Sequence, residues 1–365
     1  MKIQAVHTRS DIEVFISMSK LIYSNNKCFR RSNEDIVELL IKKKTAFKSH
    51  TEIQPYIIKI DSQVVGRFAL INDTKNPDYV MVAFFEALPN IPYLSSEIVK
   101  LAKEHFSLCK KLCVGLDGHL NYGAGILLNK FDEVPSYGLA YTMPYYPEYF
   151  EGFSSNRLFT FQFPITKVEK FHDAALSNVK GITIRTIDKK KLSEEVKIYT
   201  ALNNNSFHEH IFWAERKYEE DYELFNSFRH LIKNENLLFA EYMGKPIGFL
   251  LWFPDFNQLL RPRQLLKANT PFSIDVLRYK LINPIKRIRL AEIAVIPEFH
   301  HKLVDLLLLK RMFSEAYKQG YRLCEGGFIS ETNINSLNLT SRYIERITHV
   351  KVEPYRTYAV FEKVL

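Results

Sequence analysis

A short sequence recurs in the two halves of this chain of 365 residues. Leu112-Cys113-Val114-Gly115 returns as Leu323-Cys324-Glu325-Gly326, 211 residues later. Each copy follows a stretch with helical periodicity. Further upstream, each half carries a hairpin-like pair of apolar runs around a glycine, Gly66 in the first half and Gly248 in the second. A repeated order of elements indicates two copies of one α/β unit, and each half is long enough to bury a core.

The composition is typical of a soluble globular protein, with 46% hydrophobic and 25% charged residues. No run approaches the roughly 18 apolar residues that span a bilayer. The segment from Met1 to Asp11 lacks the apolar stretch of a secretory signal. The four cysteines show neither metal spacing nor a disulfide framework, which favours free thiols in a reducing compartment. We therefore expect a cytoplasmic protein.

The order of predicted elements sets the expected fold class, α/β. Strands alternate with helices, but antiparallel pairs intervene, so each half should form a mixed sheet flanked by helices. We expect an N-terminal domain at 1–170 and a C-terminal domain at 181–365, with the polar, Lys-rich stretch from Thr166 to Gly181 as linker. Finer predictions are a short helix near Tyr122 to Lys130 and strands at Tyr137 to Met143 and His349 to Glu353.

The net charge of +9 is unevenly distributed. Between Pro254 and Arg289 the chain carries eight basic residues and two acidic ones, interleaved with Leu, Ile, Phe and Tyr. We define residues 254–287 as the basic arm. It is expected either to receive an acidic partner, such as an acyl carrier or CoA phosphates, or to pack its apolar side on the rest of the protein. Without a nucleic-acid motif or an aromatic platform, nucleic acid is not indicated.

The segment "IAVIPEFHHKLVDLLLLKRMFSEAYKQGYRL" resembles the central motif of the GCN5-related N-acetyltransferase (GNAT) superfamily. In that family a strand ends in a Val-x-Pro-like bend, and a phosphate-cradling loop, a long helix, a second strand and an Asn-starting helix follow. The resemblance covers Leu237 to Lys363 and, with less specific motifs, Tyr56 to Phe163. It implies a tandem pair of GNAT-like units.

The resemblance further implies that acetyl-CoA or another acyl-CoA lies between the strands at Ile288–Ile296 and Arg322–Phe328. At the usual glycine positions of the phosphate loop this chain has His301 and Leu303, so side chains stand where bare amides approach a pyrophosphate in relatives. The residues expected to contact the cofactor are the main chain of Ala294, Val295 and Ile296, the loop residues His300, His301 and Lys302, and Asn333. A helix cap is the competing role for Asn333.

Three side chains are candidates for the chemistry that the resemblance implies. Glu292, near the end of its strand, is the best placed carboxylate to take a proton from an attacking amine, and a paired structural carboxylate is its alternative role. Glu325 interrupts an apolar strand and needs a partner or a raised pKa if it is buried. Tyr343 occupies the last helix, where relatives often place an acid for the leaving thiolate; core packing is the other interpretation.

Three functions therefore remain open. The leading hypothesis is a CoA-dependent N-acyltransferase that acts on an amine from its C-terminal half. The alternatives are a GNAT-fold binding or scaffold protein without catalysis, and a GNAT-fold aminoacyl transferase that uses a charged carrier. No metal is expected, because His208-x-His210 has metal-like spacing but no third ligand is evident.

Overall fold

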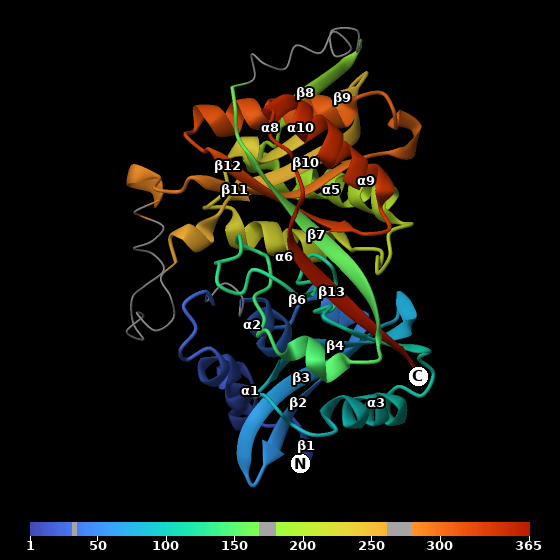
Figure 1. Cartoon of the computed structure of the whole chain (residues 1–365). Helices are drawn as coiled ribbons and strands as arrows, with labels where there is room; N and C mark the ends of the chain where they lie inside the picture. The colour runs from blue at the N-terminus through green and yellow to red at the C-terminus, as the bar shows by residue number, and fades with distance from the viewer. Residues whose placement is uncertain (31–34, 168–179, 261–276, 278) are drawn as a thin grey trace. The chain divides into compact units, whose positions relative to one another are not determined.

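Figure 1 shows the computed structural model of the chain, which describes residues 1–30, 35–167, 180–260, 277 and 279–365. Tertiary contacts divide the chain into two compact units. Of the described residues, Met1–Leu158, Leu260 and Arg356–Leu365 build the first unit. Phe159–Leu259 and the described residues between Leu277 and Tyr355 build the second. Most of the predicted linker and four of the seven cations of the basic arm lie outside the described residues. The domain limits 1–170 and 181–365 stay a prediction.

The first unit is a mixed sheet with strand order β1-β2-β3-β4-β5-β13. Its strands are antiparallel to their neighbours except β4 and β5, which are parallel. The strands are β1 (Lys2–Ala5), β2 (Thr51–Ile60), β3 (Gln63–Asp73), β4 (Asn76–Ala87), β5 (Lys111–Val114), β6 (Ile126–Leu127), which pairs with β13, and β13 (Pro354–Val364). The helices are α1 (Arg9–Ile22), α2 (Asp35–Lys42) and α3 (Leu94–His105). A capping box between Thr8 and Asp11 starts α1.

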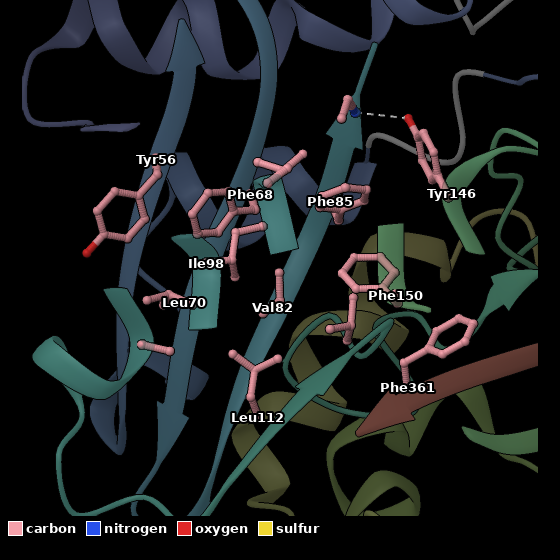
Figure 2. Close-up of a cluster of buried hydrophobic side chains, with 14 of the residues drawn as sticks. Tyr56, Phe68, Leu70, Val82, Phe85, Ile98, Leu112, Tyr146, Phe150 and Phe361 are labelled. Carbon is pink, nitrogen blue, oxygen red and sulfur yellow. Dashed lines mark hydrogen bonds between the residues drawn. The ribbon is translucent and has the colours of Figure 1, made fainter. Parts of the chain in front are cut away.

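Large aromatic side chains fill the core of the first unit (Figure 2). Phe85 of β4 meets Tyr146 and Phe150 edge to face, with ring centroids 5.2 and 5.0 Å apart. Phe361 packs against Phe150 from β13, at a centroid distance of 5.6 Å. The C-terminal strand is therefore an integral part of this core, although the sequence separates it from β5 by more than half the chain.

The second unit repeats the arrangement with strand order β7-β12-β11-β10-β9-β8. Strands β8 to β11 are antiparallel to their neighbours, whereas β11 and β12 are parallel. The strands are β7 (Ser154–Pro164), β8 (Ile182–Thr186), β9 (Leu237–Tyr242), β10 (Lys245–Pro254), β11 (Arg287–Val295) and β12 (Leu323–Ser330). The helices are α5 (Leu192–Phe207), α6 (Tyr218–Phe228), α8 (Val304–Lys318), α9 (Ile334–Asn338) and α10 (Glu345–Thr348).

The two hairpin glycines hold equivalent positions in the two units. Gly66 of β3 pairs with Ala87 of β4, and Gly248 of β10 pairs with Val295 of β11. A Cβ atom would lie 2.7 Å from the Glu86 carbonyl oxygen at Gly66 and 2.7 Å from the Ala294 carbonyl oxygen at Gly248. Both glycines are thus required by close approach of the neighbouring strand, and their recurrence supports the repeat read from the sequence.

Three predicted elements are wrong. Residues 122–130 contain no helix but carry β6, because Gly125 has a positive φ of 85° and Ile126 pairs with Ala359 of β13. Neither 137–143 nor 349–353 forms a strand. His349 itself has a φ of +56°, which ends the preceding helix. Strand β1 at Lys2–Ala5 was not predicted. The fold class, a mixed α/β architecture in both units, is confirmed.

All four cysteines are free thiols, and Cys113 and Cys324 are buried. Among the described helices, none is both long enough and apolar enough to cross a bilayer.

Candidate active site

In each unit the two parallel strands separate after four paired residues. Pairing of β11 with β12 ends at Leu290 and Gly326, although β11 continues to Val295. A bulge at this point lets Ala291 intervene between the residues that pair with β10. In the first unit, β4 and β5 part after Val82 and Val114. Each separation leaves one edge of a strand without a strand partner.

The exposed edge of β11 presents the main chain of Val295. Ile296 donates its main-chain N–H to the Ile247 oxygen at 2.9 Å, so Ile296 faces β10. Successive residues of a strand direct their main-chain N–H and C=O groups to opposite sides. The main-chain groups of Val295 therefore point away from β10, and those of Ala294 point toward it. The Nε2 atom of His300 lies 3.0 Å from the Val295 oxygen. Of the three residues expected to bind a pantetheine arm, only Val295 is therefore directed into the gap.

The equivalent edge of β4 is occupied by tyrosine hydroxyl groups. Leu88 donates to the Val65 oxygen at 2.8 Å, which turns the main chain of Ala87 away from β3. Tyr145 donates its hydroxyl to the Ala87 oxygen at 2.9 Å, and the Ala87 N–H donates to the Tyr146 hydroxyl at 3.2 Å. Among the described residues, no side chain takes the Val295 N–H in this way. In the first unit, side chains of the unit itself thus occupy the edge of β4 beyond its pairing with β5. At the equivalent edge of β11 in the second unit, the described side chains leave the Val295 N–H group available.

Asp117 closes the N-terminal gap further. Its Oδ1 accepts the main-chain N–H of Phe84, the bulge residue of β4, at 2.8 Å. Burial raises the pKa of the Asp117 carboxyl to about 6, against the opposing effects of the Phe84 N–H and the charge of Arg67. A Cβ atom at Gly123 would approach the other carboxylate oxygen to 2.5 Å, so the turn at 117–123 is shaped around this side chain.

Glu292 lies on the corresponding stretch of β11 and faces α5. It pairs with Leu251, and the neighbouring pair of Ala294 with Phe249 packs in the cluster that α5 covers. The Tyr199 hydroxyl donates to Glu292 Oε2 at 2.6 Å, and Asn203 Nδ2 donates to the same oxygen at 2.8 Å. Burial, and next the charge of Glu292, raise the pKa of Tyr199 well above its usual value, so that this phenol remains a donor.

The helix that supplies these donors is fixed in position. The Asn204 side chain makes two hydrogen bonds with the main chain of Arg216. Its Nδ2 donates to the Arg216 oxygen at 2.9 Å, and its Oδ1 accepts the Arg216 N–H at 2.9 Å. Thr200 donates to Asp221 Oδ2 at 2.7 Å, and Arg216 pairs with the same buried carboxylate. Because these contacts set the rotation of α5, its Tyr199 and Asn203 side chains are preorganised toward Glu292.

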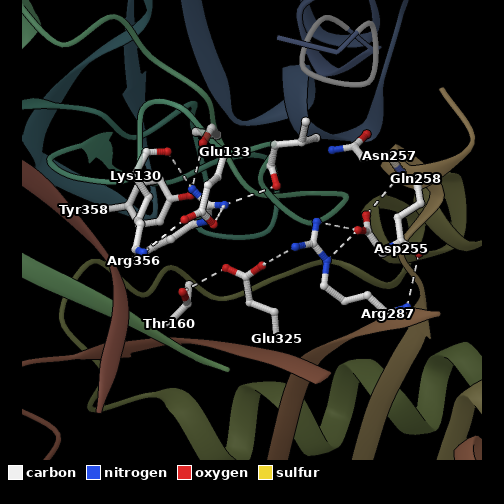
Figure 3. Close-up of polar contacts among 12 residues, drawn as sticks. Lys130, Glu133, Thr160, Asp255, Asn257, Gln258, Arg287, Glu325, Arg356 and Tyr358 are labelled. Carbon is white, nitrogen blue, oxygen red and sulfur yellow. Dashed lines mark hydrogen bonds and ion pairs between the residues drawn. The ribbon is translucent and has the colours of Figure 1, made fainter. Parts of the chain in front are cut away.

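Glu325, the second carboxylate candidate, sits in a different network (Figure 3). It is fully buried, accepts the Thr160 hydroxyl at 3.0 Å and lies 3.9 Å from a nitrogen of Arg287. Arg287 in turn donates from Nε to Asp255 Oδ2 at 2.7 Å. Glu325 therefore has the buried partner that its place in an apolar strand predicts, namely Arg287, which is itself paired with Asp255. Arg287, the last residue of the basic arm, and Arg289, two residues further on, are both buried, so these two cations are internal.

The loop between β11 and α8 keeps a glycine-like backbone without glycines. His301 has a φ of +62° and Leu303, the residue before α8, a φ of +59°. Asp305 follows in the first turn of α8, where its Oδ1 accepts the Leu306 N–H at 2.9 Å, and burial raises the pKa of its carboxyl. Lys302 lies with its ammonium 4.3 Å from the ring centre of Phe299. The loop conformation therefore suits an anion, while His301 and Leu303 narrow the space for it.

The two remaining candidates lie on the segment after β12. Asn333 caps α9, accepting the Ser336 N–H with its Oδ1 at 3.1 Å. Tyr343 belongs to the turn of π-helix at Leu339–Ile344 and is half-buried. The structure brings neither side chain into contact with Glu292.

Sequence reasoning missed Tyr199 and Asn203 altogether. They lie 93 and 89 residues from Glu292 along the chain, and nothing local to Glu292 indicates them. A usable signal exists in the helix itself: Asn203 and Asn204 are poor helix formers within a helical pattern, which points to a role for their side chains.

No family model matches the chain. Protein YghO of Escherichia coli is 20% identical over 97% of this chain and 93% of its own length. A bacterial ceramide synthase of Caulobacter vibrioides is 22% identical over 51% of this chain and 47% of its own length.

Solved structures with the same fold cover the whole chain. The GCN5-related glucosamine N-acetyltransferase region of a fungal multi-domain β-N-acetylglucosaminidase aligns with a TM-score of 0.58 at 12% identity, over 99% of this chain and 38% of that one. A tandem GNAT protein from the clavulanic acid biosynthesis pathway aligns with a TM-score of 0.54 at 11% identity, over 100% of this chain and 98% of that one. The chain is therefore a tandem GNAT-like protein in fold.

Proposed function

We propose that this protein is an N-acyltransferase that transfers an acyl group from acetyl-CoA or another acyl-CoA to an amine, with its active site in the C-terminal unit. The observation that carries the proposal is the placement of Glu292. This half-buried carboxylate lies just past the point where β11 and β12 part, and two donors of α5 hold it there. The acyltransferase fold of the solved neighbours agrees with this chemistry.

The N-terminal unit is less suited to the reaction. Tyr145 and Tyr146 take up both main-chain groups of Ala87, and Asp117 takes up the Phe84 N–H. A ligand that pairs with this edge would have to displace three side chains. At the corresponding edge, no side chain of the described residues takes the Val295 N–H group, which favours the C-terminal unit as the binding site.

Several residues of the C-terminal unit are suited to hold an acyl-CoA. The Val295 main chain would pair with the pantetheine arm, and His300, His301 and Lys302 at the start of α8 would face the phosphates. The left-handed backbone at His301 and Leu303 supports this role, whereas their side chains reduce the available space. We therefore expect CoA to bind more weakly than to a loop with glycines at these two positions.

Glu292 would act as the base. An amine reaches the site as an ammonium ion, and it becomes a nucleophile only after losing a proton to a group within hydrogen-bonding reach or through one water. Tyr199 and Asn203 orient Glu292 for that step, since both donate hydrogen bonds to its carboxylate. The acyl donor supplies a thioester carbon at which a C–N bond forms and a C–S bond breaks, so that an ammonium and a thioester give an amide, a thiol and one proton.

The direct test measures thiol release from acetyl-CoA and longer acyl-CoAs in the presence and absence of a panel of primary amines. We expect amine-dependent thiol release by the wild-type chain and its loss, by a factor of roughly 10²–10⁴, in Glu292→Gln. Glu219→Gln, the same exchange at an exposed position of α6, is the matched control and should retain the wild-type rate.

The side chains of His301 and Leu303 reduce the space for CoA phosphates, which favours one competing function, a GNAT-fold binding protein without catalysis. If the wild-type chain releases no thiol and its melting temperature does not respond to any acyl-CoA, the proposal is wrong, and a GNAT-fold binding protein without catalysis becomes the better account. The bacterial ceramide synthase among the relatives points the other way, because forming a ceramide makes an amide from an acyl group and an amine.

A further inference from the structure

A buried amide oxygen without a partner lies beside Glu292. Asn203 is fully buried, and its Nδ2 donates to the Glu292 carboxylate. Because an ionised carboxylate only accepts hydrogen bonds, this contact fixes which side of the amide is nitrogen and leaves Oδ1 pointing elsewhere. Within the described residues, Asn203 Oδ1 has no hydrogen-bond partner. Buried acceptors are nearly always satisfied, so this one is expected to receive a donor that the described residues do not supply.

A second buried polar atom without a partner follows on the same face of the helix. Ser206 Oγ is buried and makes no hydrogen bond among the described residues. Tyr199, Asn203 and Ser206 occupy positions i, i+4 and i+7 of α5 and therefore form one stripe. Side chains so spaced lie about 5–6 Å apart at Cβ, close enough for Asn203 and Ser206 to contact one small molecule.

The chemistry of this stripe selects the ligand. Asn203 Oδ1 requires a donor, and the neighbouring carboxylate of Glu292 attracts positive charge while it repels a carboxylate or a phosphate. A primary ammonium satisfies both conditions, because it carries three N–H donors and a positive charge. Ser206 both donates and accepts, so its natural partner is a group that does the same, such as a hydroxyl.

We infer that Asn203 and Ser206 form the acceptor subsite of the C-terminal unit, and that its ligand class is a primary amine with a hydroxyl group close to the nitrogen. The inference rests on the proposed function for the purpose of the site, but the binding itself does not depend on an acyl donor. Asn203 thereby has two roles, since one end of its amide orients Glu292 and the other receives the amine that Glu292 deprotonates.

The test uses the full-length chain without any acyl donor and measures thermal stability against ligand concentration. Three small probes separate the contacts: 2-aminoethanol carries both groups, ethylamine lacks the hydroxyl, and choline keeps the charge and the hydroxyl but has no N–H donor. The variants are Asn203→Leu, which removes the amide at similar size, and Ser206→Ala, which removes a single oxygen. Asn205→Leu, at an exposed position of the same helix, is the matched control.

We expect 2-aminoethanol to raise the melting temperature of the wild type and of Asn205→Leu, and choline to have no effect. In Asn203→Leu the dissociation constant for 2-aminoethanol should rise about 10–100-fold, as expected when a hydrogen bond to a charged group is lost. In Ser206→Ala the preference of 2-aminoethanol over ethylamine should disappear while ethylamine binding stays. This second variant reports on the site even if Asn203→Leu folds poorly.

Equal stabilisation of the wild type by choline and 2-aminoethanol would overturn the inference, as would unchanged binding in Asn203→Leu. Absence of any response of the wild type to the amines would also overturn it. These outcomes are separate from those of the proposed function, because acyl-CoA binding is measured in its own titration. A chain that binds amines but no acyl-CoA would retain the subsite and refute the acyltransferase, and the reverse result would refute only the subsite.

Discussion

The carboxylate of Asp117 accepts the main-chain N–H of Phe84 at 2.8 Å, at the place where β4 and β5 separate. Burial disfavours the ionised form of this carboxyl group and raises its pKa to about 6 from an ordinary value of 3.8. A carboxyl group with a raised folded-state pKa stabilises the fold below its unfolded pKa, and that contribution is lost as the pH rises through the folded pKa.

Asp117→Asn should therefore stabilise the chain at neutral pH. The asparagine oxygen can still accept the Phe84 N–H, but it carries no charge to desolvate. We expect a gain in unfolding free energy of up to about 3 kcal/mol at pH 7 that shrinks toward zero as the pH falls to about 4. Urea unfolding of wild type and variant across this range measures it. A difference that stays constant with pH would contradict the assignment, and Glu97→Gln, at an exposed site, should give no such trend.

Substitution by glycine should change the stability of the chain in opposite directions at the two adjacent residues His300 and His301. His301 has a φ of +62°, which glycine adopts without strain, so His301→Gly should stabilise the chain by roughly 0.5–1 kcal/mol. His300 has a φ of −57° and bonds the Val295 oxygen, so His300→Gly should cost roughly 1 kcal/mol. Thermal unfolding of both variants provides the comparison.

The same loop variant carries a functional expectation. Removing the His301 side chain clears space in front of the α8 amides, so His301→Gly should bind CoA more tightly than the wild type. Isothermal titration with CoA measures this. Tighter binding to the wild type than to His301→Gly would mean that the imidazole itself contacts the ligand.

The fold could be predicted from the sequence because its signals are local. The apolar periodicity of α8 and the repeated Leu-Cys-x-Gly strand need no knowledge of distant residues. The predicted helix at 122–130 failed for the opposite reason: Ile126 and Leu127 are extended because they pair with Ala359 and Tyr358, more than 200 residues away. Local propensity carries no information on such a partner.

In the candidate site, too, the residue with a local sequence signal could be predicted, and the residues that depend on distant contacts could not. Glu292 stood out because its place on the strand before the bend was visible in the sequence. Its donors on α5 were not, because they meet it only after the sheet and helix have packed. Glu325 was equally conspicuous as a charge in an apolar strand, and only the contacts with Thr160 and Arg287 distinguish its role from that of Glu292.

The paired glycines offer a test of the repeat. Gly66→Ala and Gly248→Ala each place a Cβ atom 2.7 Å from a neighbouring carbonyl oxygen, of Glu86 and Ala294 respectively. Both variants should lose roughly 1–3 kcal/mol of unfolding free energy from forced backbone shifts. Only Gly248→Ala should also reduce amide formation, since it displaces the strand that carries Glu292. Gly152→Asn, where nothing lies within 4 Å, is the control for stability. Equal activity in both alanine variants would argue against a catalytic C-terminal unit.

The two carboxylate candidates should separate when stability and activity are measured together. Glu325→Gln breaks its buried interaction with Arg287, so we expect a loss of roughly 1–3 kcal/mol in unfolding free energy with most of the amide formation retained below the transition. Glu292→Gln should show the reverse, with little change in stability and loss of amide formation, because a neutral amide still accepts hydrogen bonds from Tyr199 and Asn203 but takes no proton. Chemical unfolding and thiol release on the same preparations decide the matter. If Glu325→Gln abolished activity in a fully folded chain, Glu325 rather than Glu292 would be the residue on which the chemistry depends.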